Sequence, residues 1–509
     1  MASISNVLLF FLILSTCEAL KILVVYPMPS RSHGILGEGV VRPLLKAGHE
    51  VTFITAFQYK NPPANLRQID VSGNVKLLQG IKILANEVPT MTHGFVTSLM
   101  RMLQTKTLEH DNVQKLLNDP TEHFDVVIAE LILGALYDAP FIWVFPGEVH
   151  STVLSMIDAA PSAAYTCDLQ STSSPPFSFR ERLEEIWSRI TAEAYDYMYH
   201  EPAEAHEYNR LIAPLIVKRG RQPPPYSDVR FNISMILGNS HVSIGSPYTL
   251  PQNYKSIGGY HINEEFHPLT EELKNIMESN KNGVIYFSMG SNLKSKEWPE
   301  EIKTGLLKMF GNLKQTVLWK FEEDLPNVPK NVHILKWAPQ PSILTHPNCV
   351  AFITHGGQLS TTETIYSGVP IIGIPVFGDQ PSNVKKAAAK GYGLEVKLSY
   401  SLVHDLKAAI QEIVSNPRYK ETVKKLSLVY HDRPVKPADE LVHWVQHVVR
   451  TRGAPHLRSM ALVVPLYQRL YLDVAALVIG ALIALLYLLS KLRDVVRSIL
   501  KKDTNKKSD

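Results

Sequence analysis

The chain has 509 residues, more than one hydrophobic core accommodates and enough for two ordinary domains with additional segments. Its 20% charged and 45% hydrophobic residues are typical of a globular protein with some membrane-associated sequence. The formal net charge of +4 is small for this length, and no basic patch with interleaved aromatic residues occurs, which argues against nucleic acid as a partner.

The N-terminus has the pattern of a cleavable signal peptide. An apolar run over residues 7–14 is followed by Ser15-Thr16-Cys17-Glu18-Ala19, which places small residues at the −3 and −1 positions of a cleavage site. We therefore expect residues 1–19 to be removed and the rest of the chain to enter the secretory pathway.

The first half of the mature chain alternates strands and helices. Residues 21–26 and 50–55 are apolar runs typical of buried parallel strands, and between them a helix is expected to end at Gly48. Strand, helix and strand at this spacing predict a βαβ unit. Residues 124–129 and 141–144 are expected to add strands, and residues 180–208 have helical periodicity.

The second half repeats this rhythm. Strands are expected over residues 283–288, 316–320, 332–335 and 350–354, with helices between them. The pattern predicts an α/β fold of two doubly wound domains with a cleft between them, over residues 20–250 and 251–450. Ligands of such sheets bind at the carboxyl ends of the strands.

The C-terminus has the features of a membrane anchor. After a membrane-proximal segment, residues 451–470, an apolar stretch over 471–490 reaches the roughly 17 residues that a spanning helix needs. The tail, 491–509, contains seven Lys and Arg residues, which favours the cytoplasmic side. We expect a single-pass type I protein with its bulk in the lumen. Lys506-Lys507 resembles the dilysine signal of endoplasmic reticulum membrane proteins.

Cysteines are too few for a disulfide framework. Cys17 belongs to the expected signal peptide, which leaves Cys167 and Cys349. Cys349 opens an apolar run and is expected to be buried and inert. The sequon Asn232-Ile233-Ser234 makes Asn232 a candidate glycosylation site.

A series of short motifs over residues 337–380 is the most specific part of the chain. In order they are Trp337-Ala338-Pro339-Gln340, His346-Pro347, Thr354-His355-Gly356-Gly357, Glu363, Gly368-Val369-Pro370 and Asp379-Gln380. The series closely resembles the donor-binding signature of the UDP-glycosyltransferases, a GT-B family (family 1) that includes the animal glucuronosyl- and glucosyltransferases. The resemblance spans essentially the whole chain, and Gly48-His49-Glu50-Val51-Thr52 is similar to arthropod members. It implies a GT-B fold of two Rossmann-like domains and a membrane-bound enzyme.

The glycine-containing loops suit a diphosphate. Thr354-His355-Gly356-Gly357 follows a strand and opens a helix, so backbone N–H groups face the ligand, and His355 adds a donor. Gly290 and Ser291, after another strand, are expected to form a second cradle. Ser360 and Thr361 are expected to add hydroxyl groups from the first turn of the helix.

The remaining donor contacts follow from the resemblance. Trp337 has a flat face for uracil, and Gln340 can hydrogen-bond the edge of the base. Glu363 matches the position that binds the ribose hydroxyls, and Asp379 and Gln380 match the pair that holds the hydroxyls of the donor sugar. Lys320 is expected to lie near the nucleotide, and Asn383 is expected to line the same loop.

His33 is the expected catalytic base. It follows the first strand, coincides with the catalytic histidine of the family, and has a side chain suited to general base catalysis near neutral pH. The family orients this histidine with an aspartate, and at that position this chain has Glu130. The following segment, 131–139, is several residues shorter than the family pattern.

The resemblance implies transfer of a sugar, with inversion, from a UDP-sugar to a hydroxyl or carboxyl group of a small lipophilic acceptor. UDP-glucose is favoured over UDP-glucuronate, and relatives act in detoxification. No cluster has metal-ligand spacing, so neither a metal nor a cofactor is expected. The membrane is a partner, and homo- or hetero-oligomers with related transferases are compatible with the sequence. Two alternatives stay open: a UDP-sugar-binding homologue that no longer catalyses, and a non-enzymatic carrier of lipophilic ligands.

Overall fold

The computed structural model describes residues 19–78, 92–129, 133–157, 162–166, 171, 173, 175–245, 247–265, 268–291 and 295–505. Four features named above lie outside these residues. They are residues 1–18 of the expected signal peptide, Glu130, Cys167 and Lys506-Lys507.

A sheet of seven parallel strands forms in the first half of the chain. Its strands are β1 (Lys21–Val25), β2 (Glu50–Thr55), β3 (Leu66–Asp70), β4 (Val126–Ala129), β5 (Phe141–Phe145), β6 (Met235–Gly238) and β7 (Tyr254–Ser256). Their order across the sheet is β3-β2-β1-β4-β5-β6-β7. The direction in which strands are added therefore reverses between β1 and β4, and this reversal is the topological switch point of a doubly wound sheet.

The second half forms a sheet of six parallel strands, which is also doubly wound. Its strands are β8 (Val284–Ser288), β9 (Thr316–Lys320), β10 (Val332–Leu335), β11 (Cys349–Thr354), β12 (Ile371–Gly373) and β13 (Gly393–Glu395). Their order is β10-β9-β8-β11-β12-β13, so the switch point lies between β8 and β11.

Helices connect these strands. In the first half they are α2 (Arg31–Lys46), α3 (His93–Leu108), α4 (Asp111–Asn118), α5 (Gly134–Tyr137), α6 (Ser151–Ser155), α7 (Phe179–Tyr195), η2 (Asp196–His200), α8 (Glu201–Leu211), α9 (Ala213–Lys218) and α10 (Tyr226–Arg230), with η1 (Ser72–Leu78). In the second half they are α11 (Glu271–Ser279), α12 (Glu300–Gly311), α13 (Gln340–Thr345), α14 (Gln358–Ser367), α15 (Gln380–Ala389), α16 (Leu402–Ser415), α17 (Arg418–His431) and α18 (Pro437–Arg450), with η3 (Ser295–Glu297) and η4 (Pro455–Leu457).

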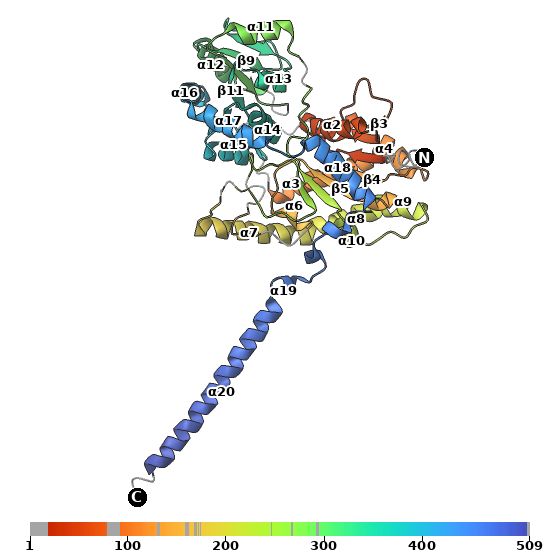
Figure 1. Ribbon diagram of the computed structural model, residues 1–509, viewed down its shortest axis with the longest axis vertical. Helices are drawn as coiled ribbons and strands as arrows, with labels where there is room; N and C mark the ends of the chain where they lie inside the picture. Colours follow the sequence, from red (N-terminus) through yellow and green to blue (C-terminus); the bar gives the residue numbers. More distant parts are fainter. Residues whose placement is uncertain are drawn as a thin grey trace, which may run out of the picture. The chain divides into compact units, whose positions relative to one another are not determined.

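Each sheet is buried on both faces, which explains its continuous apolar strands. In β1, Leu23 and Val25 join one hydrophobic cluster and Ile22 and Val24 another. The first cluster packs against helices that include α4, α8 and α9, and the second against α2 and α18. The second sheet lies in the same way between α12 with α16 and α13 with α14. Figure 1 shows these helices around both sheets.

The strands predicted from apolar runs are confirmed within one or two residues at each end. Gly48 follows α2 with a φ of 88°, a conformation that glycine adopts without a steric penalty. The expected helical segment over 180–208 is also confirmed, as α7, η2 and α8. Cys349 is buried as expected, and burial raises the pKa of its thiol to about 12, so it stays protonated and unreactive.

The first sheet takes in two segments that the sequence placed in the second domain. β7 pairs with β6 although it lies beyond the expected boundary at residue 250. Leu441, Val445 and Val448 of α18 pack into the core of the first sheet. The apolar stripe of this helix fits either sheet, so only tertiary packing decides its place.

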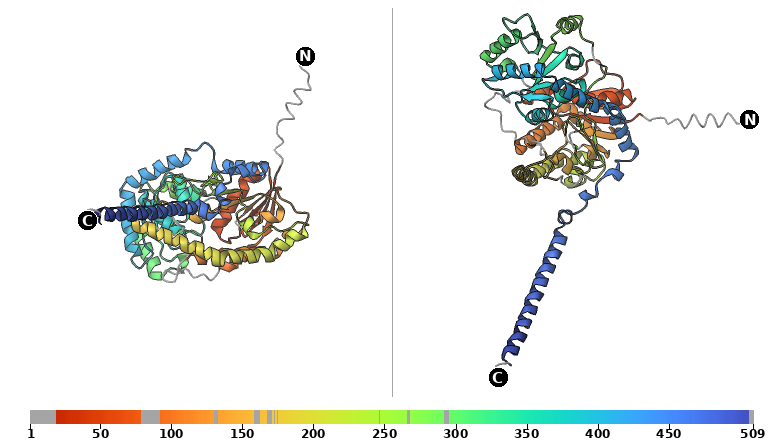
Figure 2. Two further views of the ribbon diagram at one scale, coloured as in Figure 1. Left: turned by 90° about the horizontal axis from the view of Figure 1, so that it is seen from below. Right: turned by 60° about the vertical axis from the view of Figure 1, so that its left-hand side comes forward.

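The C-terminal residues 459–509 form a separate compact unit. It contains η5 (Met460–Leu462), α19 (Leu466–Arg469) and α20 (Leu472–Asn505), and α20 is one unbroken helix (Figure 2). Residues Leu472–Ile499 are long and apolar enough to cross a membrane. The apolar stretch expected over 471–490 is therefore helical from Leu472 onward, and the helix continues through much of the basic tail.

Candidate functional site

The loops expected to bind a diphosphate meet at the switch point of the second sheet. β8 and β11 are neighbours, with Ser288 opposite Thr354 at their carboxyl ends. Gly290 and Ser291 follow β8, and the segment 355–357 follows β11. The topology therefore brings together two loops that are more than 60 residues apart in sequence, at the edge where doubly wound sheets bind ligands.

The imidazole of His355 lies between two glycines. A Cβ atom placed on Gly290 would lie 2.6 Å from Cε1 of His355, and one placed on Gly357 would lie 2.7 Å from its Nε2. A side chain at either position would therefore have to displace the ring, and Gly290 has in addition a φ of 78°, which favours glycine. The two loops hold the ring in one place.

Lys320 supports the same loop from the end of β9. Its Nζ donates to the carbonyl oxygen of Gly290 at 3.0 Å and pairs with Oε1 of Glu322 at 2.8 Å. Burial, with a smaller contribution from Lys320, lowers the pKa of His355 to about 4, so this imidazole is neutral at pH 7. Ser291 is exposed beside this group.

The N-terminus of α14 is partly engaged within the protein. Oδ2 of Asp379 accepts from the amide of Gln358 at 3.0 Å and from Nδ2 of Asn383 at 2.7 Å. Within this first turn, as the structure describes it, the amides of Leu359 and Ser360 have no hydrogen-bond partner. These two groups are the ones that a bound anion can still take up.

Three expected ligand groups have internal partners. The amide of Gly356 donates to Oγ1 of Thr354, and the hydroxyl of Thr361 donates to the carbonyl of Gln358 at 3.0 Å. Oε1 of Gln380 accepts from the amides of Val376 and Phe377. These groups shape the loops, and for a sugar hydroxyl Gln380 offers its NH2 group.

A second cluster lies one turn further along α14. Nε2 of Gln340 donates to Oε2 of Glu363 at 2.5 Å and to Oγ of Ser360 at 3.2 Å. Burial raises the pKa of Glu363 to about 7, although the bond from Gln340 acts in the opposite direction. Trp337, three residues before Gln340, exposes 63% of its surface and presents its ring to solvent.

His33 lies at the switch point of the first sheet, in the first turn of α2. Ser30 caps this helix, and its Oγ is 3.0 Å from Nδ1 of His33, which fixes the orientation of the ring. Burial lowers the pKa of His33 to about 4. The neighbouring strand β4 ends at Ala129, opposite Val25 of β1. Glu130 is the next residue and lies outside the described residues, so its pairing with His33 stays a prediction.

Contacts between the two sheets were not foreseen from the sequence. Nε2 of Gln358, at the start of α14, donates to the carbonyl of Asn239 at 3.0 Å, and Lys386 of α15 pairs with Glu148. The two residues of each pair are 119 and 238 positions apart in the sequence, and no local sequence pattern predicts these contacts. By contrast, Ser30 three residues before His33 is a recognisable helix cap.

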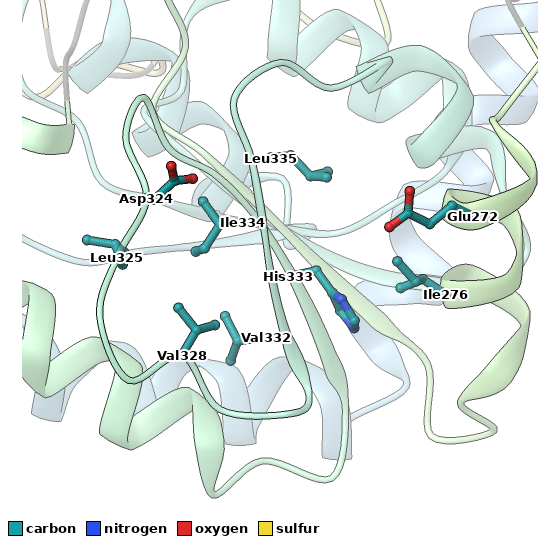
Figure 3. A pocket seen from close by; sticks show the side chains of 9 residues that line it. All are labelled: Glu272, Ile276, Asp324, Leu325, Val328, Val332, His333, Ile334 and Leu335. Atoms are coloured by element: carbon teal, nitrogen blue, oxygen red, sulfur yellow. The ribbon is translucent and has the colours of Figure 1, made fainter.

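A pocket on the outer edge of the second sheet is separate from these groups. It lies between α11, the loop over residues 324–328 and β10, and His333 projects into it (Figure 3). β9 separates β10 from β8 in the sheet, and none of the expected site residues lines this pocket.

The other predicted sites have simpler surroundings. Asn232 is exposed, and its Oδ1 accepts from Arg458 at 2.6 Å. Among the described residues, no group of three or more His, Cys, Asp or Glu side chains is placed to hold a metal ion.

The close fit around His355 makes a testable prediction. We expect Gly290→Ala to weaken UDP binding at least tenfold, because the new Cβ displaces His355. Gly220→Ala is the matched control, since Gly220 also has a positive φ, 74°, but nothing lies within 4 Å of its Cβ position. Both variants should lose about 1–2 kcal/mol of stability from backbone strain. Titration calorimetry with UDP separates them, and equal UDP affinities would contradict the assigned fit.

The chain is similar to known proteins over most of its length. Residues 82–506 match the family model described as UDP-glucoronosyl and UDP-glucosyl transferase. UDP-glucosyltransferase 2 of Dactylopius coccus is 30% identical over 482 residues, which cover 92% of this chain and 91% of that protein. Human UDP-glucuronosyltransferase 2B15 is 28% identical over 510 residues, with 94% of each chain covered.

Solved structures share the fold at low identity. The calicheamicin glycosyltransferase CalG4 aligns with a TM-score of 0.55 and 16% identity, covering 85% of this chain and 99% of that one. Os79 from O. sativa aligns with a TM-score of 0.55 and 15% identity, covering 84% and 100%. The predicted GT-B fold is confirmed by these neighbours and by the two parallel sheets.

Proposed function

We propose that this chain, which belongs to the UDP-glucoronosyl and UDP-glucosyl transferase family, transfers glucose from UDP-glucose to a hydroxyl or carboxyl group of a small lipophilic acceptor. The observation that carries the proposal is the position of His355, held between Gly290 and Gly357 beside the free amides of α14. This is a site built for the diphosphate of a nucleotide. Similarity to a Dactylopius UDP-glucosyltransferase supports glucose over glucuronate as the sugar.

The donor occupies the second sheet in this proposal. Uracil stacks on Trp337, and its N–H donates to Oε1 of Gln340, whose NH2 group is already bound to Glu363. The Glu363 carboxylate accepts the ribose hydroxyls. Asp379 and Gln380 hold hydroxyls of the sugar. The leaving UDP is stabilised by the N-terminus of α14 and by His355, without a metal ion.

His33 acts as the general base. The imidazole removes the proton of the acceptor hydroxyl while the acceptor oxygen attacks the anomeric carbon of the sugar. The bond from that carbon to the UDP oxygen breaks on the opposite face, so the configuration inverts. His33 is neutral at pH 7, because burial lowers its pKa to about 4, and is therefore in the form that accepts a proton.

A second function is favoured by one observation. Glu130 stands where the family has the aspartate that orients the base, and the following segment 131–139 is shorter than the family pattern. In this alternative the chain binds UDP-sugars without transferring them and serves as a partner of active relatives.

The cellular setting is also part of the proposal. The apolar helix Leu472–Ile499 supports membrane anchoring. We place the two sheets in the lumen of the endoplasmic reticulum, with Asn232 glycosylated and the basic tail in the cytosol. Membrane proximity supplies acceptors that partition into lipid, as a role in detoxification requires.

The test is transfer of labelled sugar to a panel of simple phenols by membranes that contain the protein. UDP-glucose and UDP-glucuronate are compared, each with a chelator present. Product from UDP-glucose alone supports the proposal in full, including independence from metal. Product from UDP-glucuronate alone would reverse the assignment of the sugar. Tight binding of UDP without any product would favour the alternative function, in which the chain binds UDP-sugars without transferring them.

A further inference from the structure

His261 is a buried imidazole at the junction of the two sheets. Only 1% of its side chain is exposed, and neither ring nitrogen has a hydrogen-bond partner among the described residues. A buried polar group without a partner is costly, and native proteins retain few of them unless another state satisfies the group. The sequence motifs of the donor site do not include this residue.

The backbone around His261 is held tightly. Gly258 donates from its amide to the carbonyl of Ser240 at 2.9 Å, and Gly259 donates to Oδ1 of Asn239 at 3.0 Å. A Cβ atom on Gly39 of α2 would lie 2.7 Å from Cα of His261, so this helix packs directly on the segment. The same helix begins beside His33, and the position of His261 is therefore tied to the acceptor half of the protein.

The side chain of His261 is directed at the donor half. Its Nε2 is 4.0 Å from Oε1 of Glu363, whereas Oε2 of that carboxylate already accepts from Gln340. A distance of 4.0 Å is too long for a hydrogen bond, and a closure of about 1 Å brings the two groups into range.

We propose that His261 is a positioning residue of the donor site, whose Nε2–H binds Glu363 when the donor is present and turns the carboxylate toward the ribose hydroxyls. The inference rests on the proposed function, because it requires that Glu363 contacts ribose. In this proposal, a residue packed against the first half of the chain contributes to nucleotide recognition. Because α2 packs on His261 and also carries His33, donor binding is coupled to the helix of the base.

The groups around this pair are compatible with that role. Gln340 of α13 binds Oε2 of Glu363 and Oγ of Ser360, so Oε1, the oxygen nearer to His261, is left for a further bond. Tyr286 of β8 lies close enough to Glu363 for the charge of the carboxylate to act on its pKa. Burial, with a smaller contribution from Arg42 of α2, lowers the pKa of the His261 imidazole to about 3. His261 is therefore neutral at pH 7 and donates through a single N–H. That bond favours the charged form of Glu363, whose pKa burial raises to about 7.

The test compares UDP with 2′,3′-dideoxy-UDP, which lacks the ribose hydroxyls. Titration calorimetry is carried out on the purified full chain in detergent, as wild type, His261→Leu and His261→Gln. We expect His261→Leu to raise the Kd for UDP about tenfold and to leave the Kd for the dideoxy nucleotide within about twofold of wild type. His261→Gln retains an N–H donor and should restore most of the affinity for UDP.

Other outcomes would overturn the inference. An equal loss for both nucleotides would mean that His261 only supports the fold, and no loss for UDP would mean that it does not act on Glu363. If His261→Leu does not fold, the same comparison is made with His261→Asn, whose shorter amide does not reach Glu363 and which should show the loss for UDP alone. Failure of the wild-type protein to bind UDP would overturn the proposed function itself, and this inference with it.

Discussion

Replacement of His33 by alanine is expected to lower the kcat for sugar transfer about 10²–10⁴-fold, the usual contribution of a general base. The Kd for UDP should be unchanged, because His33 lies in the first turn of α2 and the expected UDP ligands lie around β8 and β11. The measurement combines initial rates with a saturating phenol and calorimetry with UDP. The exposed His404 provides a control, His404→Ala, that should leave both values at wild-type levels.

The pH dependence of the wild-type enzyme tests the same assignment. A base must be unprotonated, so kcat/KM falls as the pH is lowered through the pKa of His33. Burial alone places that pKa at about 4. If the carboxylate of Glu130 pairs with the imidazole, it raises this pKa, and the fall occurs closer to the ordinary histidine value of about 6.5. Glu130→Gln should then move the fall to lower pH. A kcat that stays at the wild-type level in His33→Ala would exclude His33 as the base.

Replacement of Glu363 by glutamine is expected to change binding and stability in opposite directions. Loss of a charged acceptor for the ribose hydroxyls costs about 1.5–3 kcal/mol, which corresponds to a roughly 10–100-fold higher Kd for UDP. Without ligand, the same change removes a carboxylate whose charged form is unfavourable because it is buried. The neutral amide still accepts the hydrogen bond that Gln340 now donates to Glu363.

The sign of the stability effect follows from the raised pKa. Burial lifts the pKa of Glu363 from 4.5 to about 7, so the folded protein binds this proton more tightly than the unfolded chain. The favourable contribution of the protonated form is complete below about pH 4.5 and is lost as the pH rises through 7. At pH 8, Glu363→Gln should therefore raise the free energy of unfolding by about 3 kcal/mol, and at pH 5 the gain should fall to about 1 kcal/mol.

Chemical denaturation at these two pH values measures the effect. Glu278→Gln, on the exposed surface of α11, is the control that should change neither stability nor UDP affinity. A variant that is less stable at pH 8, or that binds UDP as the wild type does, would contradict the role assigned to Glu363.

The sequence alone determined the α/β class, most of the central strands, the apolar helix and the segments that carry the donor motifs. These features are local. A parallel strand buried on both faces is a continuous apolar run, as in residues 21–25 and 284–288, and a spanning helix is a longer one. The motifs at 354–357 and 337–340 combine residue types that few other sites require, and the topology places the first of them at the switch point.

Only the tertiary structure decided which half of the chain α18 and β7 join, and which polar groups are already engaged. The bond of Gln340 to Glu363 and the approach of His261 to Glu363 join residues 23 and 102 positions apart, and the same residue types occur elsewhere in the chain without such partners. The reason is physical. The sequence shows that an apolar helix face must be buried or that a polar side chain must be hydrogen-bonded. Which residues bury or bind it depends on the packing of segments that are distant in sequence.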